Sequence, residues 1–163
     1  MILTKQQIIE KGLFATPLDV FQVNPHSVDL RLAQDLRLAP GATMLGASID
    51  RVKLPNDVMG VVYPRSSTNR RNLSLGMTGV VDSGYEGGLV LPLTNLNDME
   101  VTLKKGERVA SIVFHRLEEP VQPRLSKYHD SDGTFVPDKS EETALIDGGD
   151  IDELKKRFAI NAQ

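Results

Sequence analysis

Short apolar runs separated by glycine, proline, asparagine and aspartate fill the chain from Ser27 to Arg116, and this pattern most restricts the fold. Residues 58–63, 89–93 and 109–114 are runs of this kind, at intervals typical of sandwiches and barrels. In residues 27–32, valine and leucine alternate with serine, aspartate and arginine, as in a strand with one buried face. The sequence therefore predicts a mostly β domain, although periodicity alone does not separate a jelly roll from a barrel.

Two helices are predicted outside this region. Thr4 and Gln7 have the spacing of a capping box and Gly12 follows as a stop, which predicts a helix from about Lys5 to Lys11. Near the C-terminus, Asp150 is a plausible helix start, and the apolar residues that follow are spaced for one face of a helix: Ile151, Leu154 and Phe158.

Composition excludes several classes of protein. The 163 residues fit one domain, and the absence of cysteine rules out a disulfide scaffold, thiolate zinc sites and cysteine nucleophiles. A net charge of −3 argues against a protein that coats nucleic acid. The sequence contains no apolar run near the ~20 residues that a membrane span needs and no signal-peptide pattern, so we expect a cytoplasmic protein without a membrane or nucleic-acid partner.

Two chemically different groups of residues lie close together in the sequence. Arg65, Ser66 and Ser67 suit phosphate, because a guanidinium can fork onto phosphate oxygens while hydroxyls and backbone N–H groups share the remaining lone pairs. The segment 79–87 brackets Asp82 and Tyr85 with glycines that permit close backbone approach. Together they predict an anion cradle beside a nucleotide pocket.

With these residues the chain resembles the trimeric dUTPase and dCTP deaminase superfamily, from Met1 to about Asp132. The segments that carry the resemblance are four motifs in order, at residues 27–32, 64–67, 79–87 and 106–112. The resemblance implies a distorted jelly-roll β-barrel of the dUTPase-like type with short N- and C-terminal helices. It also implies a division into a dUTPase-like β domain, residues 1–125, and a flexible C-terminal lid with a terminal helix, residues 126–163.

One position favours the dUTPase branch. The deaminase branch has a proton-shuttling glutamate in the strand after the third motif, where this chain has Pro92, and proline cannot move a proton. The spacing from Arg65 to Asp82 and the identity of Tyr85 also fit the dUTPase pattern, whereas the N-terminal segments 1–3 and 24–27 look deaminase-like. We therefore expect a dUTP diphosphatase that forms dUMP and pyrophosphate by Mg²⁺-assisted attack of water on the α-phosphate. The alternatives are a dCTP deaminase with a different acid/base and a non-catalytic deoxynucleotide-binding regulatory homologue.

The resemblance implies a role for individual residues. Asp82 would activate the water, with a turn-capping aspartate as the alternative. Asp29 would hold Mg²⁺ through a water, with an ion pair to Arg31 as the alternative. The implied phosphate contacts are Arg65, Ser66, Ser67, Arg70 and Ser111, the last of which replaces a usual glutamine.

The remaining implied contacts concern the base, the sugar and the assembly. Tyr85 would stack under deoxyribose and exclude a 2′-hydroxyl. Backbone groups of about residues 75–80, including Gly79 and Val80, would read the base, and Phe135 in a lid would stack on it. Because the sites of this superfamily combine residues of neighbouring subunits, the expected assembly is a homotrimer with shared active sites.

Overall fold

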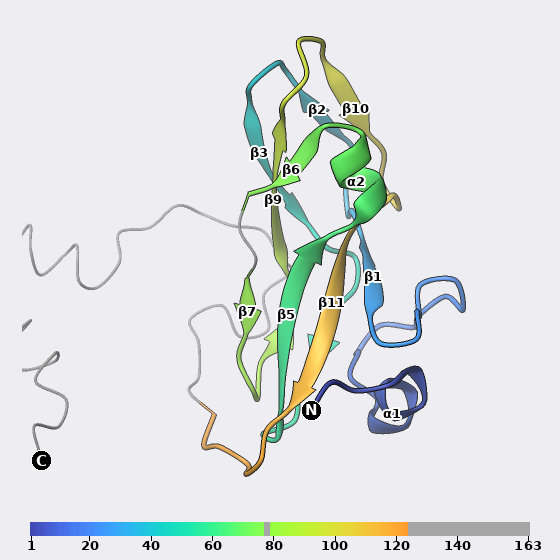
Figure 1. Ribbon diagram of the computed structural model, residues 1–163, viewed down its shortest axis with the longest axis vertical. Coiled ribbons are helices and arrows are strands. Elements are labelled where there is room, and N and C mark those ends of the chain that lie inside the picture. The colour runs from blue at the N-terminus through green and yellow to red at the C-terminus, as the bar shows by residue number, and fades with distance from the viewer. Residues whose placement is uncertain (77–78, 124–163) are drawn as a thin grey trace, which may run out of the picture.

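The computed structural model describes residues 1–76 and 79–123, which form a mostly β domain (Figure 1). The two helices of this part are α1 (Lys5–Lys11) and α2 (Ser66–Arg70). Its strands are β1 (Val28–Arg31), β2 (Leu36–Leu38), β3 (Thr43–Ala47), β4 (Val52–Lys53), β5 (Val58–Pro64), β6 (Leu73–Leu75), β7 (Val80–Val81), β8 (Glu86–Gly87), β9 (Val90–Asn95), β10 (Val101–Leu103) and β11 (Arg108–Arg116). The predicted fold class is confirmed, while most of the strands of two or three residues are additional to the prediction.

All strand pairs are antiparallel. The largest sheet has the order β1-β11-β5-β7, and a second sheet has the order β3-β9-β6. Two further pairs, β10-β2 and β4-β8, complete the domain. Figure 1 shows β5 and β11 running side by side through the lower half, with α2 above them.

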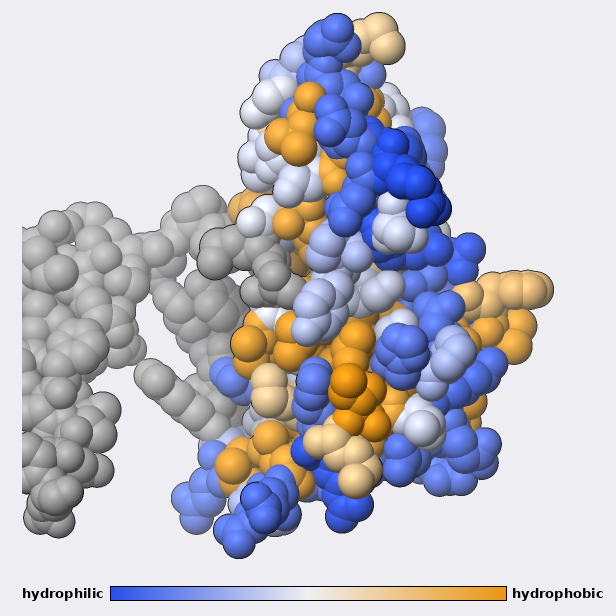
Figure 2. All heavy atoms as spheres, in the orientation of Figure 1, coloured by the Kyte–Doolittle hydropathy of each residue, from blue (hydrophilic) through white to orange (hydrophobic). Residues whose placement is uncertain are grey.

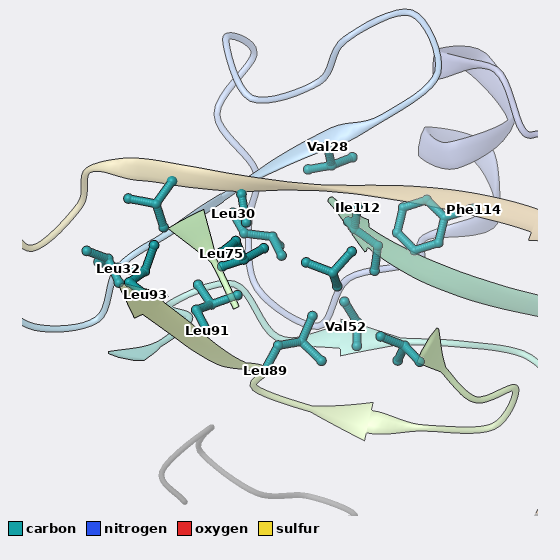
Figure 3. Packing of buried hydrophobic residues seen from close by; sticks show 14 of the residues in the cluster. Val28, Leu30, Leu32, Val52, Leu75, Leu89, Leu91, Leu93, Ile112 and Phe114 are labelled. Atoms are coloured by element: carbon teal, nitrogen blue, oxygen red, sulfur yellow. The ribbon is translucent and has the colours of Figure 1, made fainter. Parts of the chain in front are cut away.

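The core lies between the sheets (Figure 3). Leu91 and Leu93 of β9 and Ile112 and Phe114 of β11 are each at most 1% exposed. The ring of Phe114 also meets that of Phe14 edge-on, with centroids 5.8 Å apart, a favoured arrangement of two aromatic rings. Alternate residues of both central strands are thus buried, which fixes their register, since a slip by one residue would expose the whole apolar set.

The N-terminal helix forms as predicted. In α1 the Thr4 hydroxyl accepts from the Gln7 N–H, and the Gln7 side chain accepts from the Thr4 N–H at 3.0 Å. Gly12 ends the helix with a left-handed backbone, φ 58°, a conformation that glycine adopts without strain. Only Ile8 of this helix is buried, so α1 covers one margin of the core.

A β-bulge interrupts the pairing of β1 with β11. Leu30 lies opposite Ala110 but Arg31 lies opposite Arg108, so Val109 has no partner in β1. Val109 and Ala110 are consecutive and both buried. A bulge of this kind changes the direction in which the flanking side chains point, and here it lies beside the polar cluster described below.

The C-terminal segment, residues 126–163, and the helix predicted near Asp150 lie outside the described residues. Within the described residues, neither helix has the length or the apolar character to cross a bilayer.

Candidate functional site

Asp29 of β1 is the centre of a buried polar cluster. Its carboxylate is 3% exposed and meets four donors. One oxygen, Oδ1, accepts from Ser111 Oγ at 2.7 Å and from Asn24 Nδ2 at 3.1 Å. The other, Oδ2, lies 3.0 Å from Arg65 Nε and 3.4 Å from Arg108 Nη1. A carboxylate offers about four lone-pair sites, so these donors fill the hydrogen-bonding capacity of Asp29.

The bulge in β11 makes this convergence possible. In a regular strand, residues 108 and 111 are three apart and point to opposite faces of the sheet. Because Val109 is the extra residue of the bulge, Arg108 and Ser111 both reach Asp29. The two carbonyls at the bulge accept side-chain donors: Arg65 Nη1 donates to Arg108 O at 2.9 Å, and Thr68 Oγ1 to Val109 O at 2.8 Å. The Val109 carbonyl also accepts from the Arg65 backbone N–H at 3.4 Å.

Helix α2 is thereby fixed on the bulge. Arg65 is its N-cap residue and Thr68 is buried within it, so both anchors belong to the helix or its cap. A polar hollow of about 240 Å³ opens beside this anchor, lined by Asn24, Asp29, Pro64, Arg65, Ser66 and Ser111. The surface over α2 is strongly hydrophilic (Figure 2). The hollow brings together four of the predicted residues, namely Asp29, Arg65, Ser66 and Ser111, while Ser67 and the exposed Arg70 follow along α2.

The alternative role predicted for Asp29, an ion pair with Arg31, is wrong. Arg31 instead donates from Nη2 to Asp50 Oδ1 at 2.7 Å and from its backbone N–H to Asp50 Oδ2 at 2.8 Å. The role of Asp29 toward magnesium does not fit this geometry either, because two arginines and two further donors already occupy its oxygens. Among the described residues no group of three histidine, aspartate or glutamate side chains gathers to hold a metal.

A second buried pair, Asp50 and Gln22, contacts the backbone of Asp29 and was not predicted from the sequence. Asp50 is fully buried and Gln22 is 1% exposed. The Gln22 side-chain amide donates to Asp50 Oδ1 at 3.1 Å and to the backbone carbonyl of Asp29 at 2.9 Å. The Asp29 N–H returns a bond to the Gln22 carbonyl at 2.9 Å, so Gln22 holds the backbone of Asp29 on both sides. Because Gln22 and Asp50 are 28 residues apart, no local sequence pattern predicts their contact.

Asp82 and Tyr85 form the two ends of a tight turn between β7 and β8. The Tyr85 N–H donates to the Asp82 carbonyl at 3.1 Å, and Gly84 has φ 81°, a value that favours glycine at this position. Asp82 is exposed, and its carboxylate has no hydrogen bond or ion pair within the described ranges 1–76 and 79–123. The Tyr85 hydroxyl donates to the Gly88 carbonyl at 2.7 Å, and its ring packs partly against the core. The turn keeps Asp82 available, and the sugar-stacking role of Tyr85 stays a prediction.

The predicted base-reading segment connects the two sheets. Gly76, which follows β6, and Gly79, which precedes β7, are both exposed. The Gly79 carbonyl accepts from the Val62 N–H at 2.9 Å, and Val80 is 63% exposed. Residues 77–78, which join Gly76 to Gly79, lie outside the described residues. Phe135 of the predicted lid lies outside them too.

Comparison with known proteins identifies the family of this chain. The family model of the dCTP deaminase-like domain matches residues 33–117. The dCTP deaminase of Halorubrum lacusprofundi is 32% identical, over 82% of this chain and 88% of that protein. The dUMP-forming dCTP deaminase of Methanosphaera stadtmanae is 30% identical, over 83% of this chain and 74% of that protein.

Solved structures give the same fold. The dCTP deaminase of Agrobacterium tumefaciens superposes with a TM-score of 0.61 at 20% identity, covering 72% of this chain and 49% of that one, so this chain spans about half its length. Several solved dUTPases also share the fold, with TM-scores of 0.51 to 0.55 over 63 to 75% of this chain. The dUTPase-like fold expected from the resemblance is confirmed.

The expected choice of branch, a dUTP diphosphatase, is wrong. Relatives that are 30 to 38% identical to this chain carry the name dCTP deaminase, which is the alternative considered from the sequence. The expectation depended on Pro92, on the spacing from Arg65 to Asp82 and on Tyr85. These are three local features, whereas the relatives match along most of the chain.

Proposed function

Because the chain belongs to the dCTP deaminase-like family, we propose that it acts on dCTP and releases the 4-amino group of the cytosine ring as ammonia. The observation that carries this proposal is the similarity to named dCTP deaminases over more than four fifths of the chain. The hollow beside α2 supports it, because a deoxynucleoside triphosphate needs a site for its phosphates.

The phosphates would bind at the N-terminal end of α2. Arg65 uses Nε and Nη1 for Asp29 and the Arg108 carbonyl, while its Nη2 makes no hydrogen bond within the described part of the chain. This nitrogen and the exposed Ser66 hydroxyl can therefore donate to phosphate oxygens. Asp29 then acts as an internal counter-charge that orients the guanidinium before substrate arrives. Mg²⁺ remains a proposed partner of the triphosphate, without a role for Asp29 as its ligand.

Deamination requires water to add at C4 of the ring and protons to move to the leaving ammonia. Pro92 cannot take part in these proton transfers. We assign the general base to Asp82, since its carboxylate is exposed and unpaired among the described residues and lies in the third motif. Within the described residues of a single chain, no hydrogen bond or ion pair joins Asp82 to the Asp29 cluster. This separation agrees with a site shared between subunits.

The outer face of the large sheet supports the proposed homotrimer. Figure 2 shows hydrophobic side chains gathered over β5 and β11. On this face Tyr63 is 43% exposed and Val80 of the neighbouring β7 is 63% exposed. Light scattering should give about three times the 17.9 kDa of one chain, and a fully active monomer would contradict the shared site.

A second function, binding of the nucleotide without deamination, is favoured by Pro92 alone. One experiment separates the two functions. The protein is incubated with dCTP and with dUTP in parallel, ammonia is assayed, and the nucleotide products are identified by chromatography, which also shows whether dUTP or dUMP is formed. Ammonia release from dCTP supports the deaminase. Binding of dCTP in calorimetry without any ammonia would overturn it in favour of the binding protein.

A further inference from the structure

The turn that carries Asp82 is held by residues outside the four motifs. Ser83, the next residue, is only 7% exposed, so the turn is partly covered. The Leu54 N–H donates to the Tyr85 carbonyl at 2.9 Å, which ties one end of the turn to the segment after β4. The Asp82 side chain itself makes no hydrogen bond or ion pair with residues 1–76 or 79–123. The place of its carboxylate therefore depends on the backbone of the turn.

Gly84, within this turn, lies directly against Pro123. A Cβ built on Gly84 would come within 2.3 Å of Pro123 Cβ and 3.4 Å of Asn56 Oδ1. Carbon atoms that are not bonded to each other prefer a separation of about 3.5–4.0 Å. Any residue other than glycine would therefore push the turn and the proline apart. The backbone of Gly84 thus packs on the ring of Pro123, a close approach that glycine permits.

The segment after β11, residues 117–123, brings the proline to this place (Figure 1). The Leu117 N–H donates to the Asp57 carbonyl at 2.8 Å, and the Val121 N–H donates to the Asn56 carbonyl at 3.0 Å. Asn56 contacts both parts, since its carbonyl holds the segment and its side-chain oxygen lies close to Gly84. Pro123 is itself exposed, so it contributes little to the core.

We propose that Pro123 is a positioning residue for Asp82: by packing on Gly84 it limits the movement of the turn and keeps the carboxylate within reach of the attacking water. The inference rests on the proposed function, in which Asp82 is the general base. A general base must lie about 2.6–3.2 Å from the group whose proton it takes, and a misplacement of about 1 Å can cost about 100-fold in rate. An exposed proline without a functional group would in this way affect catalysis more than stability.

The test compares Pro123→Gly with Pro120→Gly, the same exchange earlier in the same segment. Pro123→Gly removes the ring from Gly84 and should lower kcat and kcat/KM for dCTP by one factor of about 10- to 100-fold, which leaves KM unchanged. Pro120→Gly should keep native turnover, because the atoms nearest to Gly84 belong to Pro123 and Asn56. Both variants should unfold at nearly the native urea concentration, because both prolines are exposed. Pro123→Ala keeps the Cβ that lies nearest to Gly84, so its kcat should fall between those of the native protein and Pro123→Gly.

A second measurement shows whether Pro123 acts through Asp82. Single turnovers are followed with the protein in excess over dCTP, in the native and Asp82→Asn backgrounds. Pro123→Gly should cause little further loss beside Asp82→Asn, because the group that it positions is already gone. A proline that only supported the fold would lower the rate by the same factor in both backgrounds.

Three results would overturn the inference while leaving the proposed function intact. They are a native rate in Pro123→Gly, a raised KM with unchanged kcat, and an equal loss in the two backgrounds. If the native protein releases no ammonia from dCTP, the proposed function fails together with the inference.

Discussion

Replacing Asp29 with asparagine should destabilise the fold strongly, because the change removes the anion that Arg65 and Arg108 share. The variant keeps the shape of the side chain, but its new NH₂ group would face donors whose hydrogen bonds the carboxylate now accepts. Removing one partner of a buried ion pair costs about 3–5 kcal/mol. Arg65 and Arg108 are 24% and 39% exposed, so water would compensate part of the lost attraction. We therefore expect a loss of about 2–4 kcal/mol in the free energy of unfolding.

Urea unfolding followed by circular dichroism measures this loss. With a slope of about 2 kcal/mol per molar urea, the midpoint should fall by about 1–2 M. All proteins must be compared at one concentration, since the proposed assembly of subunits would link stability to concentration. Glu100→Gln is the control, because it breaks the Arg37–Glu100 pair, whose side chains are 75% and 49% exposed. An exposed pair is worth at most about 1 kcal/mol, so this variant should unfold almost as the native protein does.

The double variant Asp29→Asn/Arg65→Gln completes the argument. If the two side chains stabilise the fold through each other, the combined loss should be smaller than the sum of the single losses by about 1–3 kcal/mol. Simple additivity, or a single Asp29→Asn loss no larger than that of Glu100→Gln, would refute the role of Asp29 as the organising anion of the site.

Three further outcomes are expected. Asp82→Asn should lower turnover of dCTP by about 10²–10⁴-fold with little change in binding, and near-native turnover would remove Asp82 from the mechanism. Tyr85→Ala should raise the rate on CTP relative to dCTP if the ring excludes a 2′-hydroxyl; equal losses on both nucleotides would refute that role. The backbone N–H of Lys105 and the Lys104 ammonium lower the pKa of Asp35. These contacts therefore stabilise the fold at a pH above the ordinary aspartate pKa, and the stability is lost as the pH falls through the lowered pKa. Asp35→Asn should then make the acid limb of the stability curve shallower in pH-dependent unfolding, and an unchanged limb would refute the contribution.

The parts of the fold that could be predicted are those with a local signature. The capping box of Thr4 and Gln7 and the apolar periods of β5 and β11 depend on residues close together in sequence, and each was found where expected. The strict alternation expected for β1 did not hold, because Asp29 is as buried as its leucine and valine neighbours. A charged residue can occupy such a position only with partners, and those partners come from distant parts of the chain.

The site was predicted as a set of residues but not as an arrangement. The motifs identified Asp29, Arg65 and Ser111, yet nothing in their spacing indicates that the last two converge on the first. That convergence depends on a ladder register, which is a property of two strands together. The same limitation explains why Asp50 was not predicted: it contacts Arg31 and Gln22 across 19 and 28 residues.

The bulge at Val109 makes the length of the chain at this point as important as its sequence. Exchanging Val109 for another apolar residue would keep both the buried position and the extra residue. Deleting one codon there would instead regularise the ladder and turn Arg108 and Ser111 toward opposite faces of the sheet. In a library of point substitutions this position should therefore tolerate several residues, whereas in a library of single-residue deletions it should be among the least tolerant positions of β11. Homologous chains can accordingly change the residue within this motif more readily than the number of residues in it.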